Sequence, residues 1–173
     1  MSITFKYIGL FWLLVLTAGC HVFSGGAHNE VEGRSAAKLV INGNLLLPLP
    51  AQYEELWPGE SSFIVRKTSS SIGYRWIDGD EITFIGADKT PYEFFSSAFD
   101  GSSVDEEARF IEGLGAERIT HIERDGLEFH HASLKRNEKL YVMAERLPFV
   151  VEVTMDKDSV NYIDLIIKSA SLR

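Results

Sequence analysis

The sequence contains little cysteine and little positive charge. One cysteine among 173 residues excludes an intrachain disulfide and a cysteine-rich metal cluster. The 17 Lys and Arg residues are outnumbered by 25 Asp and Glu residues, which gives a formal net charge of -8. A protein this acidic lacks the attraction to phosphate that nucleic-acid binding requires. We therefore expect no nucleic-acid partner.

Several enzyme motifs are also missing. The sequence has no Gly-x-Ser-x-Gly turn to carry a hydrolase nucleophile, and it has no phosphate-binding loop or dinucleotide fingerprint. The serines at 102 and 103 are better explained as helix caps. We accordingly expect no catalytic residue and no cofactor. A carboxylate pair of the glycosidase type stays open, because any two of the 25 acids can converge in a fold.

A transmembrane span is not predicted at the N-terminus. The apolar run at 7–16 follows one charged residue, Lys6, and falls short of the roughly 20 residues that cross a bilayer. Small residues then lead to Cys20. Charge, run length and small residues together are typical of a cleaved signal peptide, which we place at residues 1–19.

The segment Leu-Thr-Ala-Gly-Cys at 16–20 resembles the lipobox of bacterial prolipoproteins. The resemblance implies that Cys20 becomes the first mature residue and carries a thioether-linked diacylglycerol and an N-acyl chain. Several chains, at about 0.8 kcal/mol per buried CH₂, anchor a protein stably to a membrane. A signal anchor with a free Cys20, or a secreted protein cut elsewhere, is the alternative.

The residue after the cysteine bears on localisation. His21 stands where Asp would act as the retention signal in enteric bacteria. The resemblance therefore implies the periplasmic face of the outer membrane, with the periplasmic face of the inner membrane as the alternative. Residues 20–37 are rich in small and polar types without apolar periodicity, which suits a flexible tether behind the lipidated cysteine. The remainder, 38–173, has the size of one domain.

The first half of that domain alternates between strand and turn signals. We predict an edge strand over 38–47, ended by a Pro-Leu-Pro sequence, and further strands over 62–67, 72–77 and 81–85. The sequence Asp-Gly-Asp at 78–80 reads as a turn between the last two.

The second half begins with helix signals and returns to strands. Capping boxes predict helices over 91–99 and 104–114. The turn pair Asp125-Gly126 predicts a hairpin of 118–124 with 127–135. Two more strands are expected at 139–147 and 149–155. A C-terminal amphipathic helix is expected behind Ser159, with Val160, Ile163 and Ile167 facing inward.

These elements predict an α+β fold. It consists of an antiparallel sheet with a C-terminal four-strand meander and helices packed on the sheet. The element order, closed by the helical segment 162–172, resembles the α/β/α sandwich of the photosystem PsbP subunit and of DcrB-type periplasmic lipoproteins. The resemblance implies a small scaffold that binds or helps to assemble other proteins, because most members lack a catalytic centre.

Two histidines and two glutamates share one face of the predicted hairpin. A two-residue turn at 125–126 places His121 opposite His130 and Glu123 opposite Glu128. Such a set can hold a divalent metal such as zinc. However, no helix-borne ligand pair accompanies it and apolar residues continue the same face, so we expect a partly solvated outer face without metal. On the other face, His131 is expected as a hydrogen-bonded neutral histidine near the core.

Aromatic residues are plentiful between positions 53 and 99. Trp57, Tyr74, Trp76 and Tyr92 are candidates for a protein-binding surface, because Trp and Tyr with an acidic rim act as interface anchors. Packing in the core is the alternative.

The expected function is therefore binding. The sequence favours a non-enzymatic, periplasm-facing lipoprotein that contacts the membrane through its lipid and binds another envelope protein as an assembly or maintenance accessory. An immunity protein that neutralises a periplasmic toxin is one alternative. An envelope hydrolase or small-ligand-binding lipoprotein is the other.

Overall fold

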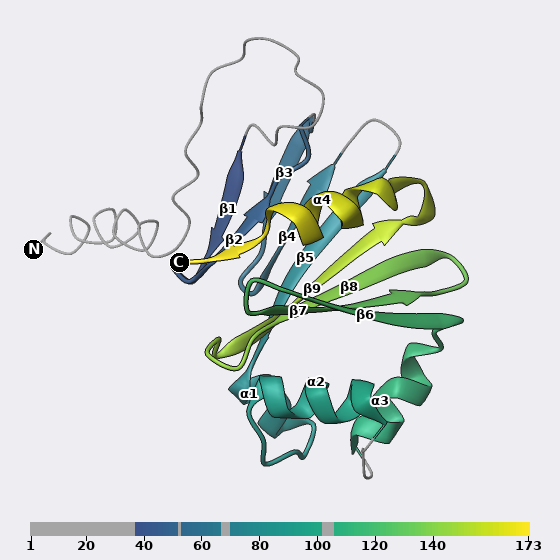
Figure 1. Ribbon diagram of the computed structural model, residues 1–173. Helices are drawn as coiled ribbons and strands as arrows, with labels where there is room; N and C mark the ends of the chain where they lie inside the picture. Colours follow the sequence, from purple (N-terminus) through teal and green to yellow (C-terminus); the bar gives the residue numbers. More distant parts are fainter. Residues whose placement is uncertain (1–36, 52, 67–69, 102–105) are drawn as a thin grey trace, which may run out of the picture.

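The computed structural model describes residues 37–51, 53–66, 70–101 and 106–173, and it is an α+β fold of two antiparallel sheets and four helices (Figure 1). The strands are β1 (Lys38–Ile41), β2 (Leu45–Pro48), β3 (Glu55–Pro58), β4 (Ser62–Arg66), β5 (Ser71–Asp78), β6 (Arg118–Arg124), β7 (Leu127–Ser133), β8 (Asn137–Met143), β9 (Phe149–Asp156) and β10 (Ser171–Leu172). The helices are α1 (Gly79–Phe84), α2 (Pro91–Asp100), α3 (Glu106–Leu114) and α4 (Asn161–Ser169).

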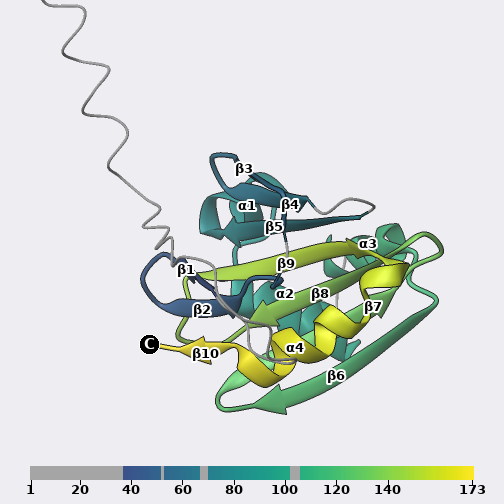
Figure 2. The ribbon, with the colours of Figure 1, turned by 90° about the horizontal axis from the view of Figure 1, so that it is seen from above.

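The seven-stranded sheet has the order β3-β4-β5-β9-β8-β7-β6, and the smaller sheet has the order β1-β2-β10. Helices α1, α2 and α3 lie on one face of the large sheet, and α4 lies on the other (Figures 1 and 2). One apolar cluster joins that second face to α4, β1 and β2, and a smaller one lies beneath the three helices. Among the described residues, none forms a helix long and apolar enough to cross a membrane.

The predicted hairpin of β6 and β7 is confirmed. Asp125 and Gly126 both have positive φ angles, of 52° and 75°, as a two-residue turn of this kind requires. The register pairs His121 with His130 and Glu123 with Glu128, as the turn predicted. The capping box that begins α2 is also present, since the Thr90 side chain and Glu93 bond to each other's backbone N–H.

The prediction of a strand over 81–85 is wrong, because helix α1 occupies that position. The preceding Asp78 is its N-cap, with the carboxylate accepting hydrogen bonds from the backbone N–H groups of Asp80 (3.1 Å) and Glu81 (3.2 Å). The short apolar segment at 82–85 fits a strand or a helix equally well, and the cap decides between them.

The single strand predicted over 38–47 is a hairpin of β1 and β2. Asn42 and Gly43 form its turn with φ angles of 46° and 72°. Strand β2 also pairs with β10 at the C-terminus, so it is the central strand of the small sheet rather than an edge. Strand β3, which pairs with β4, was not predicted.

Helix α4 begins later than predicted. Residues Lys157–Ser159 form a 3₁₀ turn, and Val160 takes the cap position without a side-chain bond. Val160 is exposed, and the buried side chains of the helix are those of Tyr162, Ile163 and Ile166. The predicted signal peptide, Cys20, most of the tether and the first residues of the 104–114 helix lie outside the described residues.

Candidate functional site

The four aromatic candidates for a binding surface lie in different surroundings. Tyr74 is buried in the main core, where its ring stacks on Phe63 at 4.4 Å and its hydroxyl lies 2.6 Å from that of Tyr162. Burial and that neighbouring hydroxyl raise the pKa of Tyr74. Trp76, two residues along the same strand, packs against the same core. Tyr74 therefore belongs to the core, and Trp76 is partly buried against it.

Trp57 is the candidate that lies on the surface, with 52% of the residue exposed. It pairs across β3 and β4 with Ile64, which is 41% exposed, so the two side chains stand side by side on one face. The Arg66 guanidinium lies 5.7 Å from the centre of the Trp57 ring and pairs with Glu55. Alternation along β4 explains the exposure of Ile64, because Phe63 and Val65 point into the core.

A second candidate site lies at the opposite end of the large sheet, where β6 and β7 bring two histidines and a glutamate together. The Nε2 atoms of His121 and His130 lie 3.8 Å and 3.7 Å from Oε2 of Glu128. All three ligand atoms lie within 4.8 Å of one another. The two nitrogen–oxygen distances are too long for hydrogen bonds.

His130 is buried, with 2% of the residue exposed. Its ring is stacked between Phe99 of α2 at 4.3 Å and His121 at 4.4 Å. Burial, reinforced by the neighbouring His121, lowers the pKa of His130 despite the opposing charge of Glu128. The expectation of a partly solvated outer face is therefore wrong for His130, because α2 packs on this part of the sheet.

Nε2 of His130 lacks a hydrogen-bond partner. Within the part of the chain that the structure describes, it is the one buried side-chain nitrogen or oxygen without a hydrogen-bond partner. Leaving such an atom unpaired costs about 1–3 kcal/mol. This atom is also the one that points at Glu128.

Tyr92 holds Glu128 in place. Its hydroxyl donates a 2.6 Å hydrogen bond to Oε1 of Glu128, and that bond, more than burial, raises the pKa of Tyr92 to about 12. The other oxygen, Oε2, is left facing the two imidazoles. Of the four aromatic candidates, Tyr92 is thus attached to the histidine cluster rather than to the exposed Trp57.

Glu123 lies at the margin of the cluster. Its Oε1 is 3.9 Å from Nε2 of His121, and its side chain is largely exposed. A hollow of about 430 Å³ opens beside it, and its lining includes Tyr92, Glu123, Glu128 and Glu145. The hollow therefore meets the cluster at Glu128, and several carboxylates together with Arg124 line it.

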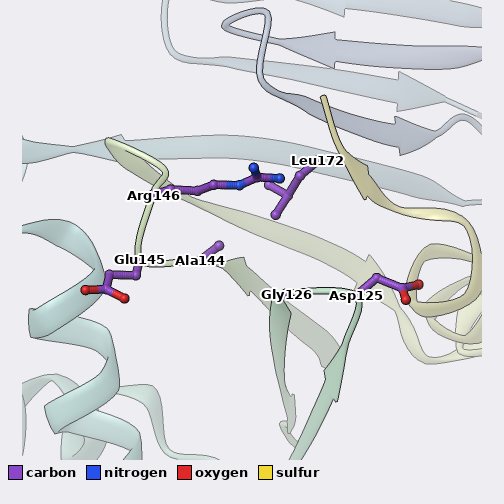
Figure 3. A pocket seen from close by; sticks show the side chains of 6 residues that line it. All are labelled: Asp125, Gly126, Ala144, Glu145, Arg146 and Leu172. Atoms are coloured by element: carbon purple, nitrogen blue, oxygen red, sulfur yellow. The ribbon is translucent and has the colours of Figure 1, made fainter.

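An adjoining hollow of about 560 Å³ lies between the β6–β7 turn, the β8–β9 turn and β10 (Figure 3). The side chain of Arg146 extends toward Leu172 there, whereas the carboxylates of Asp125 and Glu145 point away from each other. The two acids lining this hollow therefore do not meet across it.

His131 faces the other side of β7, as predicted, and is hydrogen-bonded. Its Nε2 lies 2.7 Å from Oε2 of Glu138, and the Ser133 hydroxyl donates to the other oxygen of that carboxylate at 3.0 Å. This pair gives His131 a structural role separate from the cluster of His121, Glu128 and His130.

Comparisons with protein-family models, curated proteins and solved structures find no match for this chain. The two candidate sites therefore rest on the geometry above. The sequence does not single out Ile64, and it offers Phe99 only as one of the many aromatic residues between 53 and 99. Alternation in 62–66 signals the exposure of Ile64, whereas nothing local signals that Phe99 covers His130.

Proposed function

We propose that this chain is a lipid-anchored envelope protein of bacteria, held at the periplasmic face of the outer membrane by Cys20. Its α+β domain binds another envelope protein as an assembly or maintenance accessory and carries out no reaction. The observation that supports this proposal is the exposed apolar pair of Trp57 and Ile64 at one edge of the large sheet. The resemblance of the element order to PsbP and DcrB-type proteins favours the same role.

The energetics of the pair favour a protein partner. Burying an apolar side chain of this size stabilises a complex by about 1.5–3 kcal/mol, and tryptophan is enriched among the residues that dominate interface energies. Arg66 and Glu55 supply charged groups beside the pair, like the polar rim of an interface. Strand β3 has no neighbour beyond it among the described strands, so a partner strand can extend the sheet there.

Site-specific photo-crosslinking in native membranes tests the proposed surface. With the crosslinking residue at Ile64 of the full chain, we expect one crosslinked envelope protein, lost when Trp57→Ala is added. The matched control is Phe84→Ala, which removes an aromatic side chain that is 90% exposed in α1 and should leave the product unchanged. A product that persists in Trp57→Ala would refute the surface, and capture of a toxin would replace the accessory role with the immunity role.

Metabolic labelling with palmitate tests the anchor. We expect label on the parent chain and none on Cys20→Ala, because that variant lacks the thiol to which the diacylglycerol is attached. His21→Ala serves as the control and should keep the label. Label retained in Cys20→Ala would contradict lipidation at this residue.

A further inference from the structure

We propose that His121, His130 and Glu128 form a zinc-binding site at the β6–β7 edge of the large sheet. This inference goes beyond the proposed partner binding and does not depend on it, since Trp57 and Ile64 lie at the other edge. The ion is held by two imidazole nitrogens and one carboxylate oxygen. The hollow beside Glu123 reaches the site through Glu128, which is one of its lining residues.

The spacing of the three ligand atoms suits zinc. Ligands at about 2.0–2.1 Å in a tetrahedron lie roughly 3.4 Å apart. The two Nε2–Oε2 distances, 3.8 and 3.7 Å, exceed that value by only a few tenths of an ångström. His121 is partly exposed, so it can turn out of its stack on His130 to complete the tetrahedron, while the other two ligands stay in place.

The unpaired nitrogen of His130 is independent support. A buried imidazole nitrogen that points at a carboxylate without bonding to it is costly, and a metal ion between the two supplies the missing partner for both. Phe99 fixes the plane of the His130 ring by stacking on it.

The surroundings of the site also favour a cation. Tyr92 orients Glu128 through its second oxygen, which is the way that hydrogen bonds outside the coordination sphere commonly fix metal ligands. Glu123 faces Glu128 directly across the strands, and two carboxylates in that arrangement repel each other unless a cation lies nearby. Two nitrogens and one oxygen select zinc over calcium or magnesium, which prefer oxygen ligands.

Calorimetric titration of the metal-stripped full chain in detergent with zinc chloride tests the site. We expect saturable binding of one zinc ion per chain and no heat of binding with calcium or magnesium. His121→Ala and Glu128→Gln should weaken zinc binding by about 100-fold or more, and Tyr92→Phe by 10- to 100-fold. The matched control is His131→Gln, on the same strand but the opposite face, which should bind zinc like the parent.

Two results would overturn the proposal. One is the absence of saturable zinc binding in the folded parent chain, which decides the question even where a variant fails to fold. The other is equal zinc affinity in the parent and in a His121→Ala chain that circular dichroism shows to be folded. Cobalt substitution adds a second readout, because two imidazoles and a carboxylate around the ion should produce the visible absorption of tetrahedral cobalt in the parent and not in His121→Ala.

Discussion

Replacing Phe95 with alanine is expected to lower the free energy of unfolding by about 3–5 kcal/mol. Phe95 is buried at the centre of the layer between α2, α3 and the sheet. Its ring lies 5.1 Å from that of Phe110 on α3 and 5.4 Å from that of Tyr141 on β8. Removing it leaves a cavity at the point where two helices and a strand meet, and close-packed interiors relax only partly around such cavities.

Urea denaturation followed by circular dichroism measures this change, and Phe84→Ala is its matched control. Phe84 is 90% exposed at the end of α1, so its removal should alter the free energy of unfolding by no more than about 0.5 kcal/mol. Equal losses in the two variants would contradict the packing of α2 and α3 on the sheet. The same layer covers His130 through Phe99, so the Phe95→Ala result also tests the structural support of the proposed zinc site.

Sequence patterns were reliable where a local interaction decides the structure. The Asp125-Gly126 pair fixes both the turn and the register of β6 and β7, because few other residues accept positive φ at both positions. The box of Thr90 and Glu93 likewise begins α2. Asn42-Gly43 is a turn pair of the same kind, and it divides the segment 38–47 into the two strands β1 and β2.

Sequence patterns did not predict the burial of side chains where packing between distant segments determines it. His121 and His130 were correctly paired from the hairpin, but the burial of His130 results from Phe99, which lies about thirty residues earlier and packs on the sheet through the fold of α2. Tyr74 and Trp76 were candidates for a surface because an aromatic residue suits a core strand and an interface equally well. The position of α4 and the small sheet over that face buries Tyr74 and partly buries Trp76.

Replacing Lys89 with methionine is expected to cost about 3 kcal/mol of unfolding free energy at pH 7. Lys89 precedes α2, and its ammonium group donates a hydrogen bond to the carboxylate of Glu107 on α3, of which only 3% is exposed. Methionine keeps most of the aliphatic stem but leaves a buried carboxylate without its cation, and breaking a buried pair in this way costs about 3–5 kcal/mol. The lower end applies because the Lys89 side chain is one-third exposed.

The control for Lys89→Met is Arg109→Met, which breaks a 3.9 Å pair with Glu106 on the exposed side of α3 and should cost under about 0.5 kcal/mol of unfolding free energy.

The pH dependence of the unfolding free energy separates the effect of the charge from that of packing. The hydrogen bond from Lys89 holds the pKa of Glu107 below its ordinary value of 4.5. The stabilisation by this pair is therefore present above about pH 4.5 and is lost as the pH falls through the lower pKa of the folded state.

In Lys89→Met the pKa of Glu107 should rise instead of fall, because burial then acts on the carboxyl without the opposing cation. The folded state of the variant then takes up a proton more readily than the unfolded state as the pH falls. The difference in unfolding free energy between parent and variant should accordingly be largest near pH 7 and smaller at pH 4, measured by urea denaturation at both values. A deficit that is equal at the two pH values would show that Lys89 stabilises the fold through its aliphatic stem and not through the charge of Glu107.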